Sequence, residues 1–437
     1  MTQYEKISLI NGRIHTPSGI AASITFENGR IVSIDDQTAA SDGKIIDING
    51  RTVLPGFCDT GLNFLFWAEN QDRLNLSDVH SSKEIYDALK AYSEANPNPL
   101  RGWYIAYNFP DNFVLSRDEL DAVIPSMPCA LINSKDSHAV LNSVAMNEFN
   151  MPQDDVELDE FSQHLPSLSD NDIIYLIKNY VHKATVAGIT EIWGDFYGNA
   201  ENIWSIFSES VYDTLPFRIR CNFGFDSAAD LNEFLSTGLR TGDGLPFCKV
   251  GGILIRDGLE QYEQKNMIYS AHLSGCQVIT ENNKSCLNAL ERVSKKVSKN
   301  TRHIVKNFTS GLIERMKILN LNGMAVSGQE YNFMSEAFRN GLVVCAGSGE
   351  LLKSPVKNIS ELVYNGLSVA EALSVYTWSS SWNGGFEARR GELAVGNDAD
   401  IVVLEQDPFL LRPEEIAGID VTMTFCAGCS VYDSGML

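Results

Sequence analysis

Three ionisable residues have the types needed for acid–base chemistry that requires no metal ion. Lys249 opens the stretch Lys249-Val-Gly-Gly252, Glu281 follows the apolar run that begins at Val278, and His138 precedes Ala-Val-Leu. An amine, a carboxyl group and an imidazole can exchange protons with a substrate when their surroundings move their pKa values towards the working pH. We take Lys249, Glu281 and His138 as candidate catalytic residues, although no spacing along the chain links them.

The elements that must position these residues follow a repeating pattern. In the middle of the chain, short apolar runs alternate with helical stretches, which is typical of a parallel βα architecture. Eight candidate strands fit a closed (β/α)₈ barrel. They begin near Phe57, Gly188, Phe217, Phe247, Cys276, Arg302, Gly323 and Leu342. The long gap after the first strand, about residues 67–187, predicts an inserted subdomain.

Both ends of the chain are predicted to form short β-strands. Asn11-Gly12, Asn28-Gly29 and Asn49-Gly50 lie between apolar or alternating runs, and Asn-Gly readily adopts the positive φ angles of a two-residue hairpin turn. Strand-like runs return at 399–404 and 421–425. The predicted fold class is therefore α/β: a TIM barrel (56–384) with the insert after strand 1, and a composite β-sandwich built from residues 1–55 and 385–437.

Composition limits the possible partners and the location. The 437 residues are 44% hydrophobic and 21% charged, so the chain can bury a large core. A net charge of −22 argues against nucleic-acid binding, which needs clustered Lys and Arg. Neither a signal-type N-terminus nor an apolar run of about 18 residues is present, which predicts a cytoplasmic protein without membrane contact.

Cysteine usage predicts reduced thiols. The nine cysteines are an odd count without framework spacing. Cys426 and Cys429 form the only CxxC pair, and neither a second pair nor a nearby histidine completes a zinc site, so we interpret this pair as structural.

Several segments in a shared order resemble a known family. Leu54-Pro-Gly-Phe-Cys-Asp59 is similar to the start of the motif Pro-Gly-hydrophobic-hydrophobic-Asp-x-His-x-His. The segment Asp136-Ser-His138-Ala-Val-Leu-Asn142-Ser143 is similar to Asp-Gly-His-x₄-Asn-Ser, and the segment from Gly391 to Asp400 also matches. On these motifs the chain is identified as a member of the amidohydrolase superfamily, in the branch of N-substituted formamide deformylase-like enzymes.

The resemblance implies metal-dependent hydrolysis of non-peptide C–N bonds. In the family, zinc or another divalent ion at the carboxyl ends of the barrel strands activates water by lowering its pKa to about 7. Its ligands come from strands 1, 4, 5, 6 and 8. The resemblance further implies substrate-binding roles for Asp136, His138 and Asn142 of the insert, with Trp103 in the pocket wall. For His138, a structural role that locks the insert stays equally open.

Most of the implied ligand positions hold other residues in this chain. These are Gly61 and Asn63 on strand 1, Asn307 on strand 6 and Gly349 on strand 8. The histidine signature of strand 5 is replaced by a segment containing Glu281. Glycine has no donor atom, asparagine is a poor zinc ligand, and Lys306 adds a positive charge beside Asn307. We therefore expect neither a metal ion nor another cofactor.

The remaining candidates have alternative interpretations. In a barrel mouth Lys249 could be a carbamate-forming residue, a base with a depressed pKa, or the ion-pair partner of Glu281 or Asp59. Without a metal ion, we expect the ion pair. His303 matches a position that is not a metal ligand in the family, and we interpret it as a structural residue at the start of a strand.

Three functional hypotheses follow, and function must be argued from the site rather than from the fold. The first is a catalytically silent homologue that binds a small molecule or serves an active relative. The alternative is an active hydrolase of an amide, formamide or cyclic imide with an altered, metal-free site around Lys249, Glu281 and His138. A third is a lyase or isomerase. The expected partner is a small-molecule ligand, and the resemblance also suggests that the protein forms a homodimer.

Overall fold

The computed structural model describes residues 5–35, 43–109, 113, 115–133, 138–149, 155–157, 161, 165–198, 200–211, 216–297, 301–325, 331, 333–349 and 352–435. The chain divides into two compact units, one of Met1–Phe64 with Lys178–Leu437 and one of Leu65–Ile177. Among the helices of these ranges, none has both the length and the apolar character that a membrane span requires.

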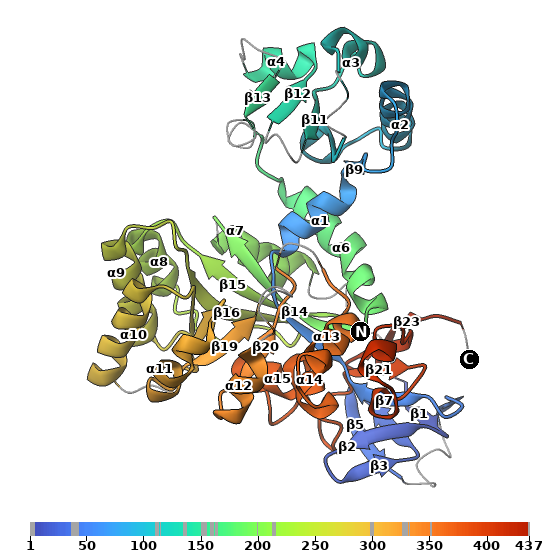
Figure 1. Cartoon of the computed structure of the whole chain (residues 1–437), viewed down its shortest axis with the longest axis vertical. Coiled ribbons are helices and arrows are strands. Elements are labelled where there is room, and N and C mark those ends of the chain that lie inside the picture. Colours follow the sequence, from blue (N-terminus) through green and yellow to red (C-terminus); the bar gives the residue numbers. More distant parts are fainter. Residues whose placement is uncertain are drawn as a thin grey trace. The chain divides into compact units, whose positions relative to one another are not determined.

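Eight parallel strands form a barrel in the first unit (Figure 1). A backbone bridge between Leu62 and Gly349 joins the two outermost strands of the sheet. In sheet order the strands are β8 (Phe57–Leu62), β14 (Ile189–Tyr197), β15 (Arg218–Gly224), β16 (Cys248–Ile255), β17 (Val278–Thr280), β18 (Ile304–Lys306), β19 (Asn322–Ala325) and β20 (Val344–Ala346). Each begins within two residues of its predicted start, and the predicted TIM-barrel fold is confirmed.

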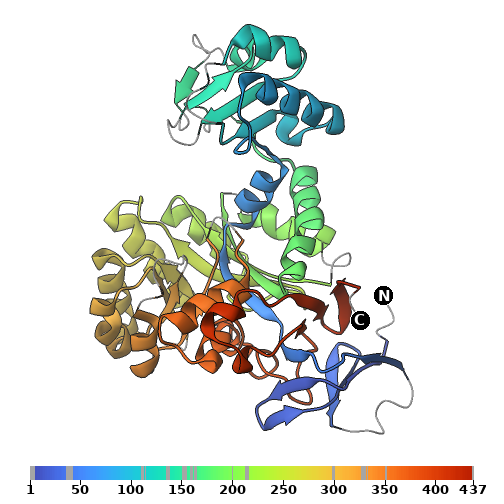
Figure 2. The same ribbon diagram turned by 45° about the vertical axis from the view of Figure 1, so that its right-hand side comes forward.

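Helices follow the strands along the chain, and α8 to α12, drawn in yellow-green to orange, lie outside the sheet in Figure 1 and in the turned view of Figure 2. Their apolar faces are buried, as in α10, where Leu287, Leu290 and Val293 recur at helical spacing. The helices of this part are α6 (Asp170–Val186), α7 (Ala200–Ser205), the π-helix η3 (Ile206–Val211), α8 (Ala228–Ser236), α9 (Gln261–Ser274), α10 (Lys284–Lys296), η4 (Ser310–Leu312), α11 (Ile313–Ile318), α12 (Met334–Arg339), α13 (Pro355–Tyr364), α14 (Val369–Tyr376) and α15 (Trp378–Gly384).

Strands from both termini form the predicted sandwich. One sheet has the order β5 (Arg30–Ile34), β4 (Ile24–Glu27), β1 (Ile7–Ile10), β6 (Lys44–Asp47). The other has the order β23 (Cys429–Asp433), β22 (Val421–Cys426), β21 (Ile401–Leu404), β7 (Thr52–Pro55), β2 (Arg13–Thr16), β3 (Gly19–Ala21), with η6 (Pro408–Leu410) and α16 (Pro413–Ile416) between β21 and β22. Leu9 and Phe26 of the first sheet share one buried cluster with Ile14, Ile401 and Phe425 of the second.

Only one of the three Asn-Gly pairs makes a hairpin. Asn28-Gly29 joins the antiparallel strands β4 and β5, and both residues have positive φ, at 51° and 78°. Asn11 and Asn49 also have positive φ, but they carry the chain between strands of different sheets, from β1 to β2 and from β6 to β7. The prediction of the backbone conformation was right, and the prediction of strand pairing was wrong for these two.

The second unit has its own five-stranded sheet, in the order β13 (Asp155–Glu157), β12 (His138–Leu141), β11 (Cys129–Asn133), β10 (Tyr104–Tyr107), β9 (Leu74–Asn75). Its helices are α1 (Phe64–Asp72), α2 (Ser82–Ala95), η2 (Leu100–Gly102), α3 (Arg117–Val123) and α4 (Ser143–Phe149). The Ser81 side chain caps α2 by accepting the Glu84 N–H at 3.2 Å.

Buried ion pairs join the amino ends of two barrel strands to the segment before β21. Arg218, the first residue of β15, donates from Nε to Asp400 Oδ2 at 2.8 Å and from Nη2 to Asp398 Oδ2 at 3.2 Å. Arg390 bonds both Asp398, at 3.1 Å, and Glu191 of β14, at 2.8 Å. Asp398 and Asp400 belong to the segment that carried the family resemblance, so in this structure that motif joins the barrel to the sandwich.

Candidate functional site

The carboxyl ends of the barrel strands, here called the mouth, carry four ionisable residues. Active sites of (β/α)₈ barrels lie at this end, because loops from all eight strands meet there. At this end Asp195 and Tyr197 come from β14 and Lys306 from β18, while Glu281 follows β17. Two carboxyl groups, an ammonium and a phenol therefore share one end of the barrel.

Lys306 and Asp195 form a buried ion pair across the barrel. Lys306 Nζ donates to Asp195 Oδ2 at 2.5 Å, and the two residues are only 7% and 5% exposed. Three strands separate β14 from β18 in the sheet, so the two side chains meet in the interior rather than along one face. Burial disfavours the ammonium, but Asp195 and the other acidic groups around it together outweigh burial and raise the pKa of Lys306.

Asn222 holds the carboxylate of this pair in place. Its register on β15 sets it directly beside Asp195, and Asn222 Nδ2 donates to Asp195 Oδ1 at 2.9 Å. Asn222 Oδ1 accepts the Gly252 N–H at 2.9 Å. The close approach depends on Gly251, because a Cβ there would lie 2.2 Å from Asn222 Oδ1.

Glu281 is half-buried at the mouth, and the side-chain amide of Asn307 contacts it. Asn307 Nδ2 donates to Glu281 Oε2 at 3.0 Å, and Asn282 Nδ2 donates to the Asn307 carbonyl at 3.2 Å. Burial raises the pKa of Glu281, although the Lys306 charge opposes the rise. Such a carboxyl group keeps its proton to a higher pH than an exposed glutamate, which is useful for acid–base work.

Asp59, Gly61 and Gly349 form the seam where the barrel closes. Ser348 donates to Asp59 through its Oγ–H and through its N–H, the latter at 3.0 Å. The Gly349 N–H donates to the Gly61 carbonyl at 2.7 Å, and the Asn63 N–H donates to the Gly349 carbonyl at 2.8 Å. The strands are so close that a Cβ on Gly347 would lie 2.5 Å from Gly61 N. The candidate ligand positions on strands 1 and 8 thus serve backbone pairing.

These residues do not fit the divalent ion that the resemblance implies. Gly61 and Gly349 offer no side-chain donor, Asn307 turns its amide nitrogen to Glu281, and the Lys306 ammonium lies beside Asp195. Within the part of the chain that the structure describes, no three His, Cys, Asp or Glu side chains are placed to hold a metal ion.

Comparison with known proteins decides the family. The amidohydrolase family matches residues 44–244 and 361–432. The chain belongs to the amidohydrolase family. The matched segments exclude residues 245–360, which contain β16 to β20 and with them Glu281, Lys306 and Asn307. Four of the five strands that supply the implied ligands therefore lie outside the matched segments.

Two relatives agree with the resemblance. The putative amidohydrolase YtcJ of Bacillus subtilis (strain 168) is 23% identical in an alignment that covers 93% of both chains. An N-substituted formamide deformylase of Arthrobacter pascens is 26% identical over 162 residues. That alignment spans 34% of this chain and 30% of the deformylase, so the similarity concerns less than a third of that enzyme.

Solved structures show the same fold. An uncharacterized metal-dependent hydrolase from Pyrococcus furiosus superposes with a TM-score of 0.76 at 16% identity, covering 92% of this chain and 100% of that one. An adenosine deaminase from Xanthomonas campestris with bound zinc gives a TM-score of 0.61 at 11% identity, covering 97% and 92% of the two chains. These superpositions show that the chain shares the fold of both proteins.

Lys249 does not lie in the mouth, and its predicted pairing with Glu281 or Asp59 is wrong. It is the second residue of β16, whereas Ile255 at the end of that strand pairs with Thr280, next to Glu281. At about 3.3 Å per residue, Lys249 and Glu281 are roughly 20 Å apart along the strands. Lys249 Nζ instead donates to the Gly244 carbonyl at 2.9 Å. The mouth lysine is Lys306.

Asn142 and Trp103, for which binding roles were predicted, are buried in the core of the unit 65–177. Asn142 is fully buried; its Oδ1 accepts the Cys129 and Ala145 N–H groups, and its Nδ2 donates to two backbone carbonyls, all at 2.9–3.0 Å. All four hydrogen-bonding positions of the amide are therefore used. Trp103 is 2% exposed and packs edge-on against Phe161.

The other two predicted binding residues are not tested. His138 is the first residue of β12, half-buried between Asn133 and Glu157 of the neighbouring strands. Asp136 lies outside the described residues. Their roles stay predictions.

An Asn142→Ala variant is expected to lose at least about 2 kcal/mol of unfolding free energy, because it leaves two N–H groups and two carbonyls of the backbone without partners. Urea denaturation of the whole protein measures the loss. Asn96→Ala is the control, since the Asn96 side chain makes one hydrogen bond near the surface, to the Tyr92 carbonyl. If both variants were equally stable, the structural role assigned to Asn142 would be wrong.

Two histidines pair at the amino end of the barrel. His303 precedes β18 and is buried; its Nδ1 accepts the Val278 N–H at 2.9 Å and its Nε2 lies 2.8 Å from His272 Nδ1. The interpretation of His303 as a structural strand-start residue is confirmed. Burial and the neighbouring His272 ring lower the pKa of His303 to about 3.

This pair predicts acid sensitivity. Because an unfolded histidine binds a proton near pH 6.5 and folded His303 only near pH 3, protons favour the unfolded chain between these values. The contribution of neutral His303 to the free energy of unfolding is fully present above pH 6.5, and it falls by about 1.4 kcal/mol per pH unit below that value. Urea denaturation at pH 7.5, 6.5 and 5.5 should show a shallower pH dependence for His303→Asn than for the native protein. Equal slopes would contradict the assignment.

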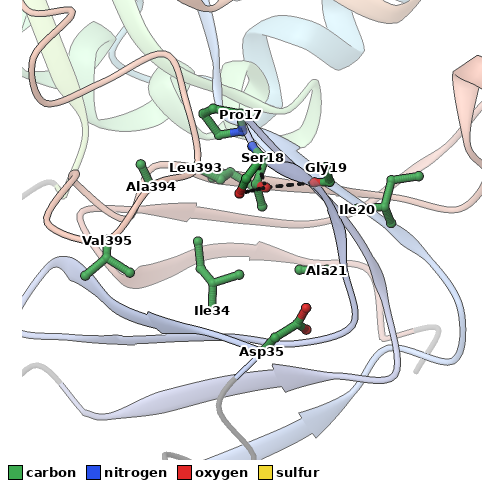
Figure 3. A pocket seen from close by; sticks show the side chains of 11 residues that line it. Pro17, Ser18, Gly19, Ile20, Ala21, Ile34, Asp35, Leu393, Ala394 and Val395 are labelled. Atoms are coloured by element: carbon green, nitrogen blue, oxygen red, sulfur yellow. Dashed lines mark hydrogen bonds between the residues drawn. The ribbon is translucent and has the colours of Figure 1, made fainter.

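A separate cavity in the sandwich has a single ionisable residue in its lining. It has a volume of about 560 Å³ and lies between the β2–β3 turn, Ile34 and the segment 393–395 (Figure 3). Of its lining residues only Asp35 is ionisable, and Asp35 Oδ1 already accepts the Ala22 and Ser23 N–H groups at 2.6 and 3.2 Å. We place the functional site at the mouth of the barrel instead.

Proposed function

We propose that this amidohydrolase-family protein binds a small organic molecule at the barrel mouth without the divalent metal of its family, and is silent in metal-dependent hydrolysis. The observation that carries the proposal is the ion pair of Lys306 and Asp195 across the interior. A buried ion pair seldom stabilises a protein more than apolar side chains of the same size would, so its presence at the mouth favours a role in binding.

Elemental analysis of the purified protein tests this proposal. We expect far less than one zinc, manganese or iron ion per chain, both as purified and after incubation with zinc followed by dialysis. The reason is that Lys306 repels a dication, and at a separation of about 4 Å this repulsion is worth roughly 2–8 kcal/mol, twice the energy between two unit charges. One tightly held ion per chain would contradict the proposal.

A second candidate is metal-free acid–base catalysis on an amide, formamide or cyclic imide. It is favoured by Glu281, whose pKa burial raises and whose carboxylate oxygen is held by Asn307. In this candidate function Lys306 has the catalytic role that was predicted for Lys249.

If that candidate holds, Glu281→Gln should reduce kcat by about 10²–10⁴-fold and remove the limb of the pH–rate profile that this carboxyl group produces. The measurement is turnover of a panel of amides, formamides and cyclic imides between pH 4 and 9, with Glu260→Gln as a surface control. Turnover that is unchanged in Glu281→Gln would end this candidate. The cytoplasmic location and the homodimer stay predictions.

A further inference from the structure

We propose that the Lys306 ammonium is a built-in cation that fills the place of a divalent ion, and that removing it opens a site for a hard divalent cation between Asp195 and Glu281. This inference rests on the proposed metal-free function and deepens it, because it names the group that excludes the metal and the class of ion that the remaining residues would accept.

The position of the ammonium carries the first step. Lys306 is the last residue of β18, and its Nζ reaches Asp195 of β14 at 2.5 Å. A side chain that bridges opposite strands must place its charge inside the ring of strands rather than on its outer face. One positive charge therefore occupies the interior at the end of the barrel where the family uses a metal.

The groups around the Lys306 ammonium have charges that complement a cation. Asp195 presents Oδ2 to Lys306 while its Oδ1 is fixed by Asn222 Nδ2. Glu281 follows Thr280, which pairs with Val305 next to Lys306, so the Glu281 carboxylate lies close enough to favour the Lys306 ammonium. Removal of the ammonium alone would leave the buried Asp195 carboxylate without its counter-charge and with the half-buried Glu281 nearby, which is costly unless another cation enters.

The donor atoms decide which cation fits. Asp195 and Glu281 offer only oxygen, and the side chains beside them, Asn222 and Asn307, are amides. Oxygen donors suit calcium, magnesium and manganese, whereas zinc sites in proteins are built mainly from histidine and cysteine. The latent site is therefore expected to take calcium or manganese.

The test compares the full-length native protein with Lys306→Met, which keeps an unbranched apolar stem of similar length but removes the charge. Thermal unfolding is followed with and without calcium or manganese chloride at constant ionic strength. We expect manganese or calcium to raise the melting temperature of Lys306→Met by at least about 2 °C in a saturable manner, because an ion that binds only the folded state stabilises it. The native protein and the control Lys249→Met, altered at the other end of the barrel, should not respond.

Two further variants keep the test decisive. Lys306→Gln retains an N–H donor for Asp195, and calorimetric titration should show one ion per chain if Lys306→Met proves too unstable to purify. The double variant Asp195→Asn with Lys306→Met should lose the response. No ion binding by Lys306→Met or Lys306→Gln, or an undiminished response in the double variant, would overturn the inference.

The two proposals fail in different ways. A stoichiometric metal ion in the native protein contradicts the proposed function. A native protein without metal, together with Lys306 variants that bind no added ion, contradicts only the inference about Lys306.

Discussion

Replacing Asp195 with asparagine is expected to lower the free energy of unfolding by about 3–5 kcal/mol, because the Lys306 ammonium then stays buried without its carboxylate. Asparagine keeps an oxygen that can accept the Asn222 amide, so the change is mainly one of charge. Adding Lys306→Met should restore part of the loss, since both charges are then absent. Urea denaturation followed by tryptophan fluorescence measures all four proteins of this cycle.

The pH dependence of the cycle has a definite sign. In the native protein burial opposes the charge on Lys306, but Asp195 raises its pKa above the ordinary value of 10.5. The pair therefore contributes stability below pH 10.5 and loses it as the pH rises through the raised pKa. In Asp195→Asn no carboxylate offsets the cost of burying the Lys306 charge. The difference in unfolding free energy between the native protein and Asp195→Asn should therefore become smaller as the pH rises. Additive effects in the cycle would show that the two residues do not interact.

Arg218→Met is expected to cost a similar amount, about 3–5 kcal/mol, at the other end of the barrel. The change leaves Asp400 buried without the guanidinium that bonds both of its oxygens, at 2.8 and 3.2 Å. Burial by itself would raise the pKa of Asp400, and Arg218 keeps it below its ordinary value. The same urea denaturation measures the loss.

The matched control for Arg218 is Arg412→Met. Arg412 bonds Glu415 at 2.8 Å, but its side chain is 71% exposed, and exposed pairs contribute little. We expect no measurable change in the control. If Arg412→Met destabilised the protein as much as Arg218→Met does, the buried network would not be the feature that joins barrel and sandwich.

The fold could be predicted from the sequence because its signals are local. Apolar runs of strand length, separated by helical stretches, located all eight barrel strands, and the two β-rich ends indicated one sandwich. Strand pairing was harder to predict, since Asn11 and Asn49 have the positive φ of a turn residue, yet the chain after each of them enters a different sheet. Their conformation is set by the Asn-Gly sequence, but the partner strand is set by tertiary packing.

The site was harder to predict because it depends on contacts between distant strands. Asp195 was missed, although a carboxylate near the end of the largely buried strand Ile189–Tyr197 was a usable signal. Lys249 was placed in the mouth although its strand was correctly predicted to begin near Phe247, and six further residues of that strand separate it from the mouth. Asn142 shows that a family motif can be preserved for packing, since all of its hydrogen bonds stay within one unit.

Lys306, not a metal ion, supplies the positive charge between β14 and β18 at the mouth of the barrel. Diffraction from crystals of the native protein grown with manganese, measured for anomalous scattering, tests it most directly. We predict no anomalous peak at the carboxyl ends of β14, β17 and β18, and continuous density between Lys306 Nζ and Asp195. A manganese ion coordinated there by Asp195 or Glu281, with Lys306 turned away, would contradict the claim.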